Sequence, residues 1–480
     1  MQLDGLIAEA NLAELGLLVQ TVGDLSSEVG SVTMDSRQVR RASLFACVPG
    51  RTADGHLFAG AALAEGAAAL LCERPLDVAA PQVVVRSVRR ALGPVCDAVY
   101  GHPSRDLLIA AVTGTNGKTT TCAFLRSVFE VNGWPARTVG TLTSHRTTPE
   151  APELHALLAE WRRDGGRAVA MEVSSHALDQ HRTDAVHFSA AVFTNLSPEH
   201  LDYHATMEDY FEAKASLFAS GRAGVAVVNA DDRWGARLAE RVGRAGDPVV
   251  TYRHADAEGL ALAPSGSTFR WRGRPVGLRV GGDFNVTNAL AAATAAEAMG
   301  ADLDAIVEGL GRVDSVEGRF QLVDAGQPFT VIVDYAHTPD GLAKILDAAR
   351  RICAGRLVAV FGAGGDRDRE KRPLMGQVAA ERADLVLVTS DNPRGEDPDS
   401  IIVEVVGGAT GATNVRADPD RASAITTALA TAAPGDVVVI AGKGHEKGQE
   451  IGGRVLPFDD VEVATAALHR IIESRQAGGR

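Results

Sequence analysis

One segment of the chain has the residue types and the spacing to surround a phosphate chain. Thr113-Gly114-Thr115-Asn116-Gly117-Lys118-Thr119-Thr120-Thr121 follows an apolar run and precedes a helical stretch that continues to about residue 131. Backbone N–H groups of such a loop can bind phosphate oxygens, Lys118 can reach the terminal phosphates, and the Thr119 hydroxyl can ligate Mg²⁺. The segment therefore predicts a nucleotide-binding loop.

The loop departs from the strict phosphate-binding pattern at its start. Val112 stands where the pattern GxxxxGK[ST] has its first glycine. The alternative interpretation is a glycine-rich turn between a strand and a helix, with Lys118 exposed to solvent. The apolar run before the loop, the Gly-Lys-Thr triplet and the helical stretch after it together favour nucleotide binding.

Two other residues could hold a cation beside this loop. Glu172 ends the apolar run 168–171, and His200 lies just past another run, in the segment 195–204. Side chains at the carboxyl ends of neighbouring strands suit an oxygen-seeking ion such as Mg²⁺. The alternative for Glu172 is a buried ion pair, and for His200 a structural histidine. Lys214 has, from its pattern alone, the features of an ordinary solvated helix residue.

Short β-branched runs recur along the chain and predict the elements that position these residues. Each run is followed by turn residues and then by a helical pattern, which predicts an α/β fold. Most runs are continuous rather than alternating, as is typical of strands buried on both faces of a parallel sheet. The predicted strands cover residues 107–112, 168–173, 186–194, 225–229, 329–334, 357–361, 385–389 and 437–441.

The length of 480 residues predicts more than one domain, since single cores stop growing near about 250 to 300 residues. A turn-rich break at Gly101-His102-Pro103-Ser104 precedes the strand predicted at 107–112, and Gly318-Arg319 precedes a new strand and helix cycle. We therefore expect domains at residues 1–105, 106–319 and 320–480.

Composition excludes several classes of protein. Hydrophobic residues make up 45% and charged residues 23% of the chain, which is typical of a folded globular protein. A net charge of -13 argues against a nucleic-acid partner. No apolar run approaches the roughly 18 residues of a membrane span, and no secretory signal opens the chain, so we expect a cytoplasmic protein. The cysteines form no CxxC pair, which argues against a zinc site.

Four segments together resemble the Mur ligase family. They are the loop 113–119, Met171-Glu172-Val173-Ser174-Ser175-His176, the stretch 195–204, and Asp334-Tyr335-Ala336-His337-Thr338-Pro339. The resemblance spans nearly the whole chain, and the missing first glycine is also a feature of this family. It implies an α/β protein with an N-terminal UDP-sugar-binding domain, a central P-loop ATPase domain and a C-terminal Rossmann-like domain that binds the incoming amino acid.

The resemblance implies ATP and Mg²⁺ as cofactors. The implied nucleotide contacts are Gly114, Thr115, Asn116, Gly117, Lys118, Thr119, Thr120, Asn288, Arg319 and Asp334. The implied cation environment is Thr119, Glu172, His200 and Lys214, the last as a carbamylated lysine, since an uncharged amine can capture CO₂ and become an anionic ligand. Lys118, Lys214, Arg319 and His337 take the catalytic roles. For Arg319, an interdomain salt bridge is the alternative.

The resemblance also implies where the two other substrates bind. The acceptor UDP-N-acetylmuramoyl-L-alanyl-D-glutamate is expected at Met34, Ser36, Arg51, Thr52, Ala53, Thr147, Thr148, Ser174, Gln180 and Arg182. One relative has Asn before the threonine pair, where this chain has Arg146. The incoming amino acid is expected at Arg372, Asp391, Asn392, Pro393, Arg394, Gly442 and Glu446. An Asp-Arg pair of one member appears here as Asp460-Val461.

Arg394 predicts the identity of the incoming amino acid. Its planar fork of donors matches a carboxylate, and meso-2,6-diaminopimelate has a distal carboxylate that lysine lacks. The alternative is that Asn392-Pro393-Arg394-Gly395 is only a turn.

The resemblance thus implies an ATP-dependent amide ligase that forms an acyl phosphate and adds diaminopimelate to the muramoyl peptide of peptidoglycan precursors. It implies no membrane span, and we expect a monomer. The alternatives are a lysine-adding member of the same family, a folylpolyglutamate synthetase, and an inactive, nucleotide-dependent scaffold.

Overall fold

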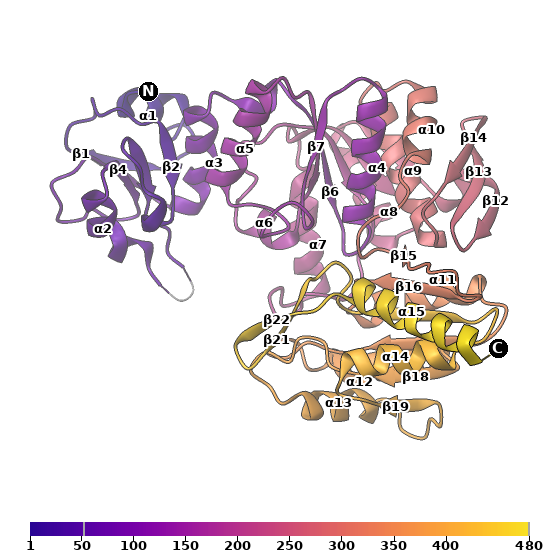
Figure 1. The fold of residues 1–480 in the computed structure, drawn as a ribbon. Helices are drawn as coiled ribbons and strands as arrows, with labels where there is room; N and C mark the ends of the chain where they lie inside the picture. Colours follow the sequence, from indigo (N-terminus) through magenta and orange to yellow (C-terminus); the bar gives the residue numbers. More distant parts are fainter. Residues whose placement is uncertain (51–52, 479–480) are drawn as a thin grey trace.

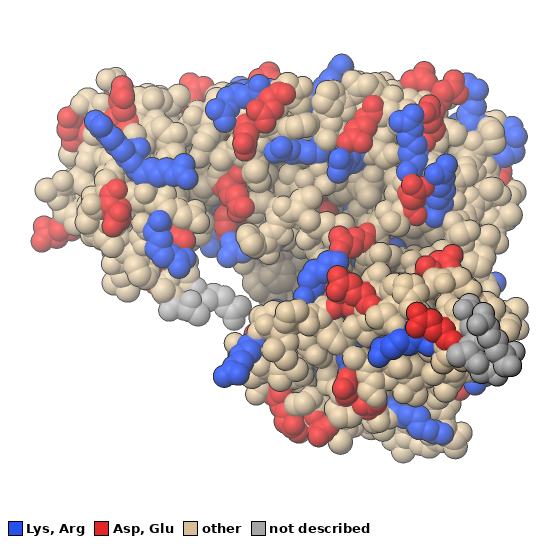
Figure 2. Space-filling model, viewed as in Figure 1, with Lys and Arg blue, Asp and Glu red and all other residues tan. Residues whose placement is uncertain are grey.

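Three lobes follow one another along the chain, each built around its own β-sheet (Figure 1). The structure is a computed structural model that describes residues 1–50 and 53–478. The N-terminal lobe and the C-terminal lobe both adjoin the central lobe, and Figure 2 shows a recess between them on one side of the molecule. Within the described residues, no helix has both the length and the apolar character needed to cross a bilayer.

The N-terminal lobe contains a five-stranded sheet with the strand order β1-β5-β4-β3-β2. Strand β1 is antiparallel to β5, and the other pairs are parallel. The elements are α1 (Leu3–Glu9), β1 (Leu18–Val22), β2 (Ser31–Thr33), β3 (Ser43–Ala46), α2 (Ala59–Ala64), β4 (Ala67–Cys72), β5 (Gln82–Val85) and α3 (Val88–Val99). Short 3₁₀ helices cover Ser36–Gln38, Gly55–Phe58 and Pro103–Arg105.

The central lobe contains a six-stranded parallel sheet with the order β11-β10-β9-β6-β8-β7. Its elements are β6 (Leu108–Thr113), α4 (Lys118–Val131), β7 (Ala136–Val139), α5 (Ala151–Arg163), β8 (Ala168–Glu172), α6 (Ser175–Asp179), β9 (Phe188–Phe193), α7 (Met207–Ala215), β10 (Ala223–Asn229), α8 (Arg233–Ala245), β11 (Val249–Tyr252), α9 (Asp283–Ala298) and α10 (Leu303–Gly311). Two 3₁₀ segments, Ser216–Phe218 and His254–Asp256, join these elements. A three-stranded antiparallel sheet, β12 (Glu258–Ala263), β13 (Gly266–Trp271) and β14 (Arg274–Leu278), is attached at the edge.

Apolar residues fill the space on both faces of the central sheet. Phe124 and Val128 of α4 pack with Leu290 of α9 on one face. On the other face, Leu154 of α5 and Phe211 of α7 belong to a second apolar cluster. Because both faces are covered, the strands are continuous apolar runs, as the sequence predicted.

The C-terminal lobe contains a six-stranded sheet with the order β15-β16-β20-β17-β18-β19, in which only the β15 pair is antiparallel. Its elements are β15 (Gln321–Leu322), β16 (Thr330–Asp334), α11 (Pro339–Arg351), β17 (Leu357–Phe361), α12 (Lys371–Arg382), β18 (Leu385–Val388), α13 (Pro398–Gly407), β19 (Val415–Ala417), α14 (Arg421–Thr431), β20 (Val437–Ala441) and α15 (Asp460–Gly478). A hairpin of β21 (Gly448–Ile451) and β22 (Arg454–Pro457) precedes the last helix.

The predicted α/β class is confirmed, and every predicted strand is present. The strands at Leu357–Phe361 and Val437–Ala441 have the predicted bounds, and the others begin and end within two residues of them. The antiparallel sheet β12–β14 was not predicted. Cys47, Cys72, Cys96 and Cys122 are buried free thiols, whereas Cys353 is partly exposed.

A fully buried ion pair joins the first residues of α14 and α15 in the C-terminal lobe. Arg421 and Asp460 are both 0% exposed at their side chains and lie 2.6 Å apart. The Arg421 guanidinium also donates to the carbonyl oxygens of Ser390, at 3.3 Å, and Ala441, at 3.0 Å. These two carbonyls follow β18 and end β20, so one side chain fixes the edge of the sheet where both strands finish. Asp460, part of the departure noted in the sequence, thus has a structural partner.

Replacing Arg421 with methionine is expected to destabilise the C-terminal lobe by about 3 to 5 kcal/mol, because Asp460 would remain buried without a partner. Hydrogen exchange at β18 and β20 measures this, since a protein with several lobes does not unfold in a single step. The double variant Arg421→Met/Asp460→Leu is the control and should recover most of the lost protection. Unchanged exchange in the single variant would contradict the prediction.

Candidate active site

The predicted phosphate loop connects β6 to α4 at the carboxyl edge of the central sheet, where ligands bind in open parallel sheets. Gly114 has a φ of +148°, and a Cβ added there would lie 1.9 Å from Thr194 Oγ1. Gly117 has a φ of +89°, and its added Cβ would lie 2.3 Å from Asn288 Oδ1. Only glycine fits these two positions, so the loop keeps the open backbone that phosphate binding needs.

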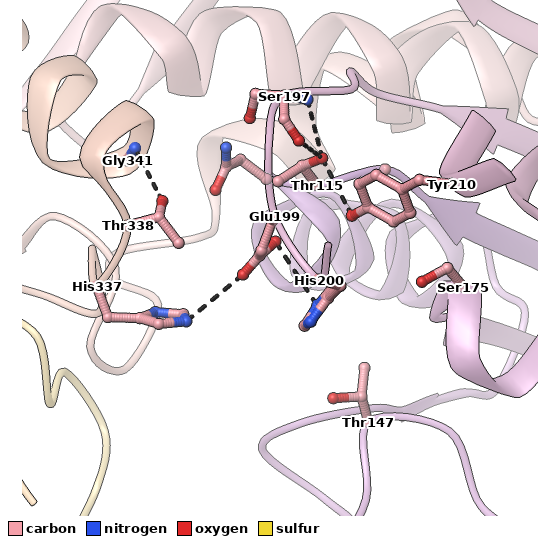
Figure 3. A network of polar contacts seen from close by, with 12 residues as sticks. Thr115, Thr147, Ser175, Ser197, Glu199, His200, Tyr210, His337, Thr338 and Gly341 are labelled. Atoms are coloured by element: carbon pink, nitrogen blue, oxygen red, sulfur yellow. Dashed lines mark hydrogen bonds and ion pairs between the residues drawn. The ribbon is translucent and has the colours of Figure 1, made fainter. Parts of the chain in front are cut away.

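The segment after β9 fastens this loop. The Thr115 N–H donates to the Asn195 carbonyl at 2.9 Å, and the Asn116 N–H donates to Asn195 Oδ1 at 3.1 Å. The Thr115 hydroxyl accepts from the Ser197 N–H at 3.1 Å and lies 3.2 Å from the Tyr210 hydroxyl. Figure 3 shows this network beside Glu199 and His200. The segment 195–204 is therefore held in register with the phosphate loop.

Two lysines share one backbone oxygen of the loop. Lys118 Nζ donates to the Gly114 carbonyl at 3.0 Å, and Lys214 Nζ donates to the same oxygen at 2.9 Å. The two amines therefore lie within about 6 Å of each other, a distance at which two like charges repel strongly in a buried site. Burial lowers the pKa of Lys118, and the charges of Glu199 and Glu172 oppose that effect.

Lys214 is buried rather than solvated, so the interpretation from its pattern alone is wrong. Its side chain comes from α7, is 1% exposed, and lies 4.6 Å from the centre of the Tyr210 ring. Burial, reinforced by the nearby Lys118, moves the pKa of Lys214 well below its ordinary value. The residue can therefore present an uncharged amine inside the protein, a state that the local sequence did not reveal.

Glu172 and Thr119 flank the same loop, Glu172 from the end of β8 and Thr119 from the first turn of α4. Glu172 ends β8, is 2% exposed, and accepts hydrogen bonds from the Thr141 N–H at 2.9 Å and the Thr141 hydroxyl at 3.2 Å. Among the described residues, its carboxylate is hydrogen-bonded to the uncharged groups of Thr141, which argues against a buried ion pair as its role. Across residues 1–50 and 53–478, no three His, Cys, Asp or Glu side chains are grouped closely enough to hold a metal ion.

A carboxylate that the sequence analysis missed lies between the two predicted histidines (Figure 3). Glu199 Oε2 is 3.7 Å from His200 Nε2, and Glu199 Oε1 is 3.5 Å from His337 Nε2. Burial lowers the pKa of His200 to about 4, despite the opposing charge of Glu199. Burial disfavours the charged form of Glu199, but the contacts with His337, His200 and Lys118 hold its pKa below the usual value. Its position beside a predicted histidine was the only signal in the sequence.

The connection between the lobes and the start of the C-terminal lobe supply the opposite wall. Arg319 lies over the Tyr335 ring, 4.4 Å from its centre, and its Nη2 is 3.4 Å from Thr119 Oγ1. Among the described residues, the guanidinium contacts Tyr335 and Thr119 and no carboxylate, which argues against an interdomain salt bridge. The Asp334 carboxylate accepts from the Phe320 N–H at 2.7 Å and the Ala336 N–H at 2.8 Å, and burial raises its pKa. Asp334 therefore ties the connection between the lobes to the end of β16.

These groups line one cavity of about 470 Å³ between the central and C-terminal lobes. Of the predicted residues, the cavity is lined by Thr115, Asn116, Gly117, Lys118, Thr119, Thr120, Thr147, Glu172, His200, Asn288, Arg319, Asp334 and His337. Gly114 and Lys214 lie behind its wall. The cavity extends past Tyr252, Phe284 and Ile345, which give one end an apolar surface.

The predicted acceptor residues of the central lobe lie beside this cavity. The Thr148 hydroxyl donates to the Glu172 carbonyl at 3.0 Å and accepts from the Ser174 N–H at 3.0 Å. The Arg182 guanidinium donates to Gln180 Oε1 at 2.7 Å and to the Thr148 carbonyl at 3.1 Å. Thr148, which is 1% exposed, thus connects Ser174 to Arg182 and Gln180, and the neighbouring Thr147 lines the cavity.

Arg146 belongs to a cluster of arginines around one carboxylate. Glu150 Oε1 lies 3.0 Å from Arg146 Nη1 and 3.1 Å from Arg182 Nε. Its other oxygen lies 2.6 Å from Arg89 Nη1 of the N-terminal lobe. This chain thus has a third arginine where a relative has asparagine, and Glu150 also joins the N-terminal and central lobes.

Of the predicted residues of the N-terminal lobe, the three that the structure describes, Met34, Ser36 and Ala53, do not line the cavity. Met34 packs at the margin of that lobe's core, and Ser36 begins the 3₁₀ helix Ser36–Gln38. Ala53 is exposed. Arg51 and Thr52 lie outside the described residues.

The predicted amino-acid site lies in the C-terminal lobe, at the ends of β18 and β20. Asn392 Nδ2 donates to Glu446 Oε2 at 2.8 Å, and the buried Lys443 donates to Asn392 Oδ1 at 3.0 Å. A Cβ added at Gly442 would lie 2.5 Å from Asp391 Oδ2. Tyr335, which lines the cavity, lies 5.0 Å from the His445 ring and so separates the two sites.

Arg394 is held in a defined orientation rather than lying in an ordinary turn. It has a φ of +53° and pairs through its backbone with β21, where its N–H donates to the Glu450 carbonyl at 2.9 Å. Its guanidinium donates to the Gly365 carbonyl at 2.7 Å and lies 3.3 Å from a Glu450 oxygen. Nη2 has no partner among the described residues, so one edge of the fork is available to a ligand.

Arg372 lies in a different environment from the one expected of a ligand contact. Its side chain is 0% exposed, and it pairs with Glu396 at 2.8 Å and with Glu404 at 2.8 Å. Through Glu396, Arg372 therefore holds the segment that follows Arg394 in place from the interior of the lobe. Arg367 is exposed and lies next to Gly364, beside the Arg394 guanidinium. Two arginines five residues apart cannot be distinguished by sequence alone, and burial favours Arg367 as the one that can reach a ligand.

Comparison with known proteins gives consistent matches along the chain. Residues 28–100 match the model described as Mur ligase family, catalytic domain. Residues 112–296 match the Mur ligase middle domain, and residues 318–444 match the Mur ligase, glutamate ligase domain.

The chain is also similar to individual proteins over nearly its full length. A UDP-N-acetylmuramoyl-L-alanyl-D-glutamate--2,6-diaminopimelate ligase of Streptomyces coelicolor is 45% identical over 97% of both chains. A solved structure of a ligase with that same name has a TM-score of 0.69 and 34% identity, covering 98% of this chain and 99% of the other. The MurF ligase of Thermotoga maritima, solved in complex with ADP, shares the fold, with a TM-score of 0.66, 20% identity and coverage of 95% and 100%.

Proposed function

The chain belongs to the Mur ligase family, and from this premise we propose that it is an ATP-dependent ligase that joins meso-2,6-diaminopimelate to UDP-N-acetylmuramoyl-L-alanyl-D-glutamate. The names of the relatives that match along the whole chain support this proposal. In the structure, the proposal is supported by one cavity that Lys118, Glu172, His200 and Arg319 line together. Arg394 lies in the adjacent C-terminal lobe.

We assign one substrate to each lobe. Residues 1–105 would bind the uridine nucleotide, residues 106–319 ATP, and residues 320–480 the incoming amino acid. The separate sheets of the three lobes support these boundaries, since no sheet crosses either of them. The acceptor's peptide would run along the polar residues from Arg182 to Thr147 and end at the cavity.

The first chemical step would be phosphoryl transfer. An oxygen of the D-glutamyl γ-carboxylate attacks the γ-phosphorus of ATP, the bond between that phosphorus and the β,γ-bridging oxygen breaks, and ADP leaves. Two anions must approach each other, so cationic groups have to offset their repulsion. Lys118 at the loop and Arg319 on the opposite wall lie where they can contact the transferred group from two sides.

The second step would form the amide. The diaminopimelate amine, as its uncharged form, attacks the carbonyl carbon of the acyl phosphate, the bond from carbon to the phosphate oxygen breaks, and phosphate leaves. The amine loses a proton as the amide forms. Positioning of the amine by the C-terminal lobe would provide most of the rate acceleration, because the acyl phosphate is already activated.

The residues fit the cation chemistry of such a ligase. Thr119 offers a hydroxyl and Glu172 a carboxylate, both at the cavity wall, and these oxygens would hold Mg²⁺ together with the nucleotide. Bound Mg²⁺ would neutralise charge on the transferred phosphoryl group. We further propose that Lys214 is carbamylated: its amine is buried, its pKa is lowered, and the neutral form is the one that reacts with CO₂. The carbamate would add an anionic oxygen ligand behind the loop.

The assay that tests the proposal measures ADP release and product mass together. Pure protein with ATP, Mg²⁺ and the UDP-muramoyl dipeptide should release ADP and extend the peptide with meso-diaminopimelate. With L-lysine, kcat/KM should be lower by about 10⁴-fold, because the free Nη2 edge of Arg394 would have no carboxylate to bind. Equal use of lysine would favour the lysine-adding alternative, ligation of glutamate to a folate would favour a folylpolyglutamate synthetase, and ATP binding without any turnover would favour a scaffold.

A further inference from the structure

Glu199 connects two lobes inside the cavity. Its own segment, 195–204, is fastened to the phosphate loop through Thr115 and Asn116. Its carboxylate is 15% exposed and points toward His337 of the C-terminal lobe, 3.5 Å away (Figure 3). The contact therefore links the part of the central lobe that holds the phosphates to the loop that follows β16.

Hydrogen bonds on both the ring and the backbone of His337 hold this residue in place. Its Nδ1 lies 2.9 Å from the Tyr335 carbonyl oxygen, and its own carbonyl accepts from Lys371 Nζ at 3.0 Å. The Tyr335 N–H in turn donates to the Gly318 carbonyl at 2.9 Å, in the connection between the lobes. The ring therefore lies between the Tyr335 carbonyl on one side and the Glu199 carboxylate on the other.

Other contacts also join the central and C-terminal lobes. One lies beside the phosphate loop, and another lies away from the cavity. Asn116 Nδ2 donates to Asp340 Oδ2 at 3.1 Å at the rim of the phosphate loop. Asp283 of the central lobe pairs with Arg351 of α11, and neither residue lines the cavity. The Asp283–Arg351 pair is thus a matched reference, an ion pair between the same two lobes but away from the phosphates.

We propose that Glu199 is a positioning residue that docks His337, and with it the Arg319 wall, against the phosphate loop when the C-terminal lobe closes. The inference rests on the proposed ligase function and assigns to Glu199 a role in assembling its site. Glu199 touches His337 and His200 rather than the loop backbone, so its loss should impair closure and turnover more than nucleotide binding.

The test compares Glu199→Gln, which keeps the shape and removes the charge, with Asp283→Asn as the control. For Glu199→Gln, kcat should fall by about 30- to 100-fold, while the dissociation constant for ADP changes less than about threefold. Solution scattering with a non-hydrolysable ATP analogue and both other substrates should show less compaction than in the wild type. Asp283→Asn should keep kcat and compaction within about twofold. Full activity and compaction of Glu199→Gln would overturn the inference.

A double-variant cycle with His337→Gln tests the specific partner. If Glu199 acts through His337, the double variant should be no more than about threefold slower than the slower single variant. Losses that multiply would overturn the inference. So would a tenfold shift in the Mg²⁺ concentration for half-maximal activity, which would make Glu199 a cation ligand instead.

Two further results distinguish an error about Glu199 from a variant that does not fold and from an error in the proposed function. Should Glu199→Gln fail to fold, as thermal unfolding would reveal, Glu199→Asp provides the shorter carboxylate and should show an intermediate loss of kcat. A wild-type protein that forms no product refutes the proposed function, whereas a productive wild type matched by Glu199→Gln refutes only the role of Glu199.

Discussion

Replacing Lys214 with methionine is expected to lower kcat by about 10³-fold, the equivalent of about 4 kcal/mol in the barrier, with ADP affinity changed less than about threefold. Methionine fills a similar volume in the buried site, so the loss would reflect the missing head group rather than a cavity. Lys214 contacts the Gly114 carbonyl and has no exposed surface through which bulk solvent could replace it.

Two further variants distinguish a carbamate from a simple charge. Lys214→Arg keeps a positive charge but cannot carry CO₂, so it should be as slow as the methionine variant. Lys214→Glu places a permanent carboxylate in the site and should recover part of the activity. In the wild type, ¹³C-labelled bicarbonate should give a carbamate carbon signal that is absent from Lys214→Met. A methionine variant with more than about a tenth of the wild-type kcat would contradict the prediction.

Arg394→Ala is expected to reduce kcat/KM for meso-diaminopimelate by about 10³-fold. A carboxylate bound by a guanidinium makes two charge-assisted hydrogen bonds, each worth about 1.5 to 3 kcal/mol. The nucleotide cavity does not include Arg394, so ATP binding should stay within about twofold of the wild type. Steady-state kinetics with the amino acid varied, together with calorimetry for ADP, measure both quantities.

Controls for Arg394 come from the same lobe. Arg394→Lys keeps the charge but loses the planar fork, and it should fall between the wild type and the alanine variant. Arg416 lies on the edge strand β19, and within the described part of the chain its guanidinium donates only to the nearby carbonyls of Thr413 and Val415. Arg416→Ala should leave kcat/KM within about twofold. An alanine variant at 394 that discriminates against lysine as strongly as the wild type would show that specificity lies elsewhere.

The central and C-terminal sheets were predictable because each inner strand is buried on both faces. A run such as Leu357–Phe361 must be apolar throughout, so its bounds are visible in the sequence. Strands β12 to β14 were not predicted, because their alternating pattern is interrupted by glycine, proline and arginine and one face is exposed. The class of the fold therefore followed from the sequence, but the attached sheet did not.

The site was predictable where chemistry depends on local spacing and unpredictable where it depends on burial. The phosphate loop is a contiguous motif, so its residues lie together at the cavity as expected. The burial of Lys214 arises from the packing of α7 against the loop, which no local pattern records. Arg372 is buried at the start of α12, whereas Arg367 is exposed. This difference can be predicted only when the position of the helix is known.

The Arg421 guanidinium ties the end of β20 to the chain after β18, with β17 lying between the two strands. The Asn392 and Glu446 side chains come from the loops after these strands and meet at 2.8 Å. If the amino acid binds here, as we propose, the loop tips rather than the strands would match the distance between its two ends. A protein engineer who wants the site to accept a shorter or longer diacid should therefore redesign the loop tips and leave the anchored backbone unchanged.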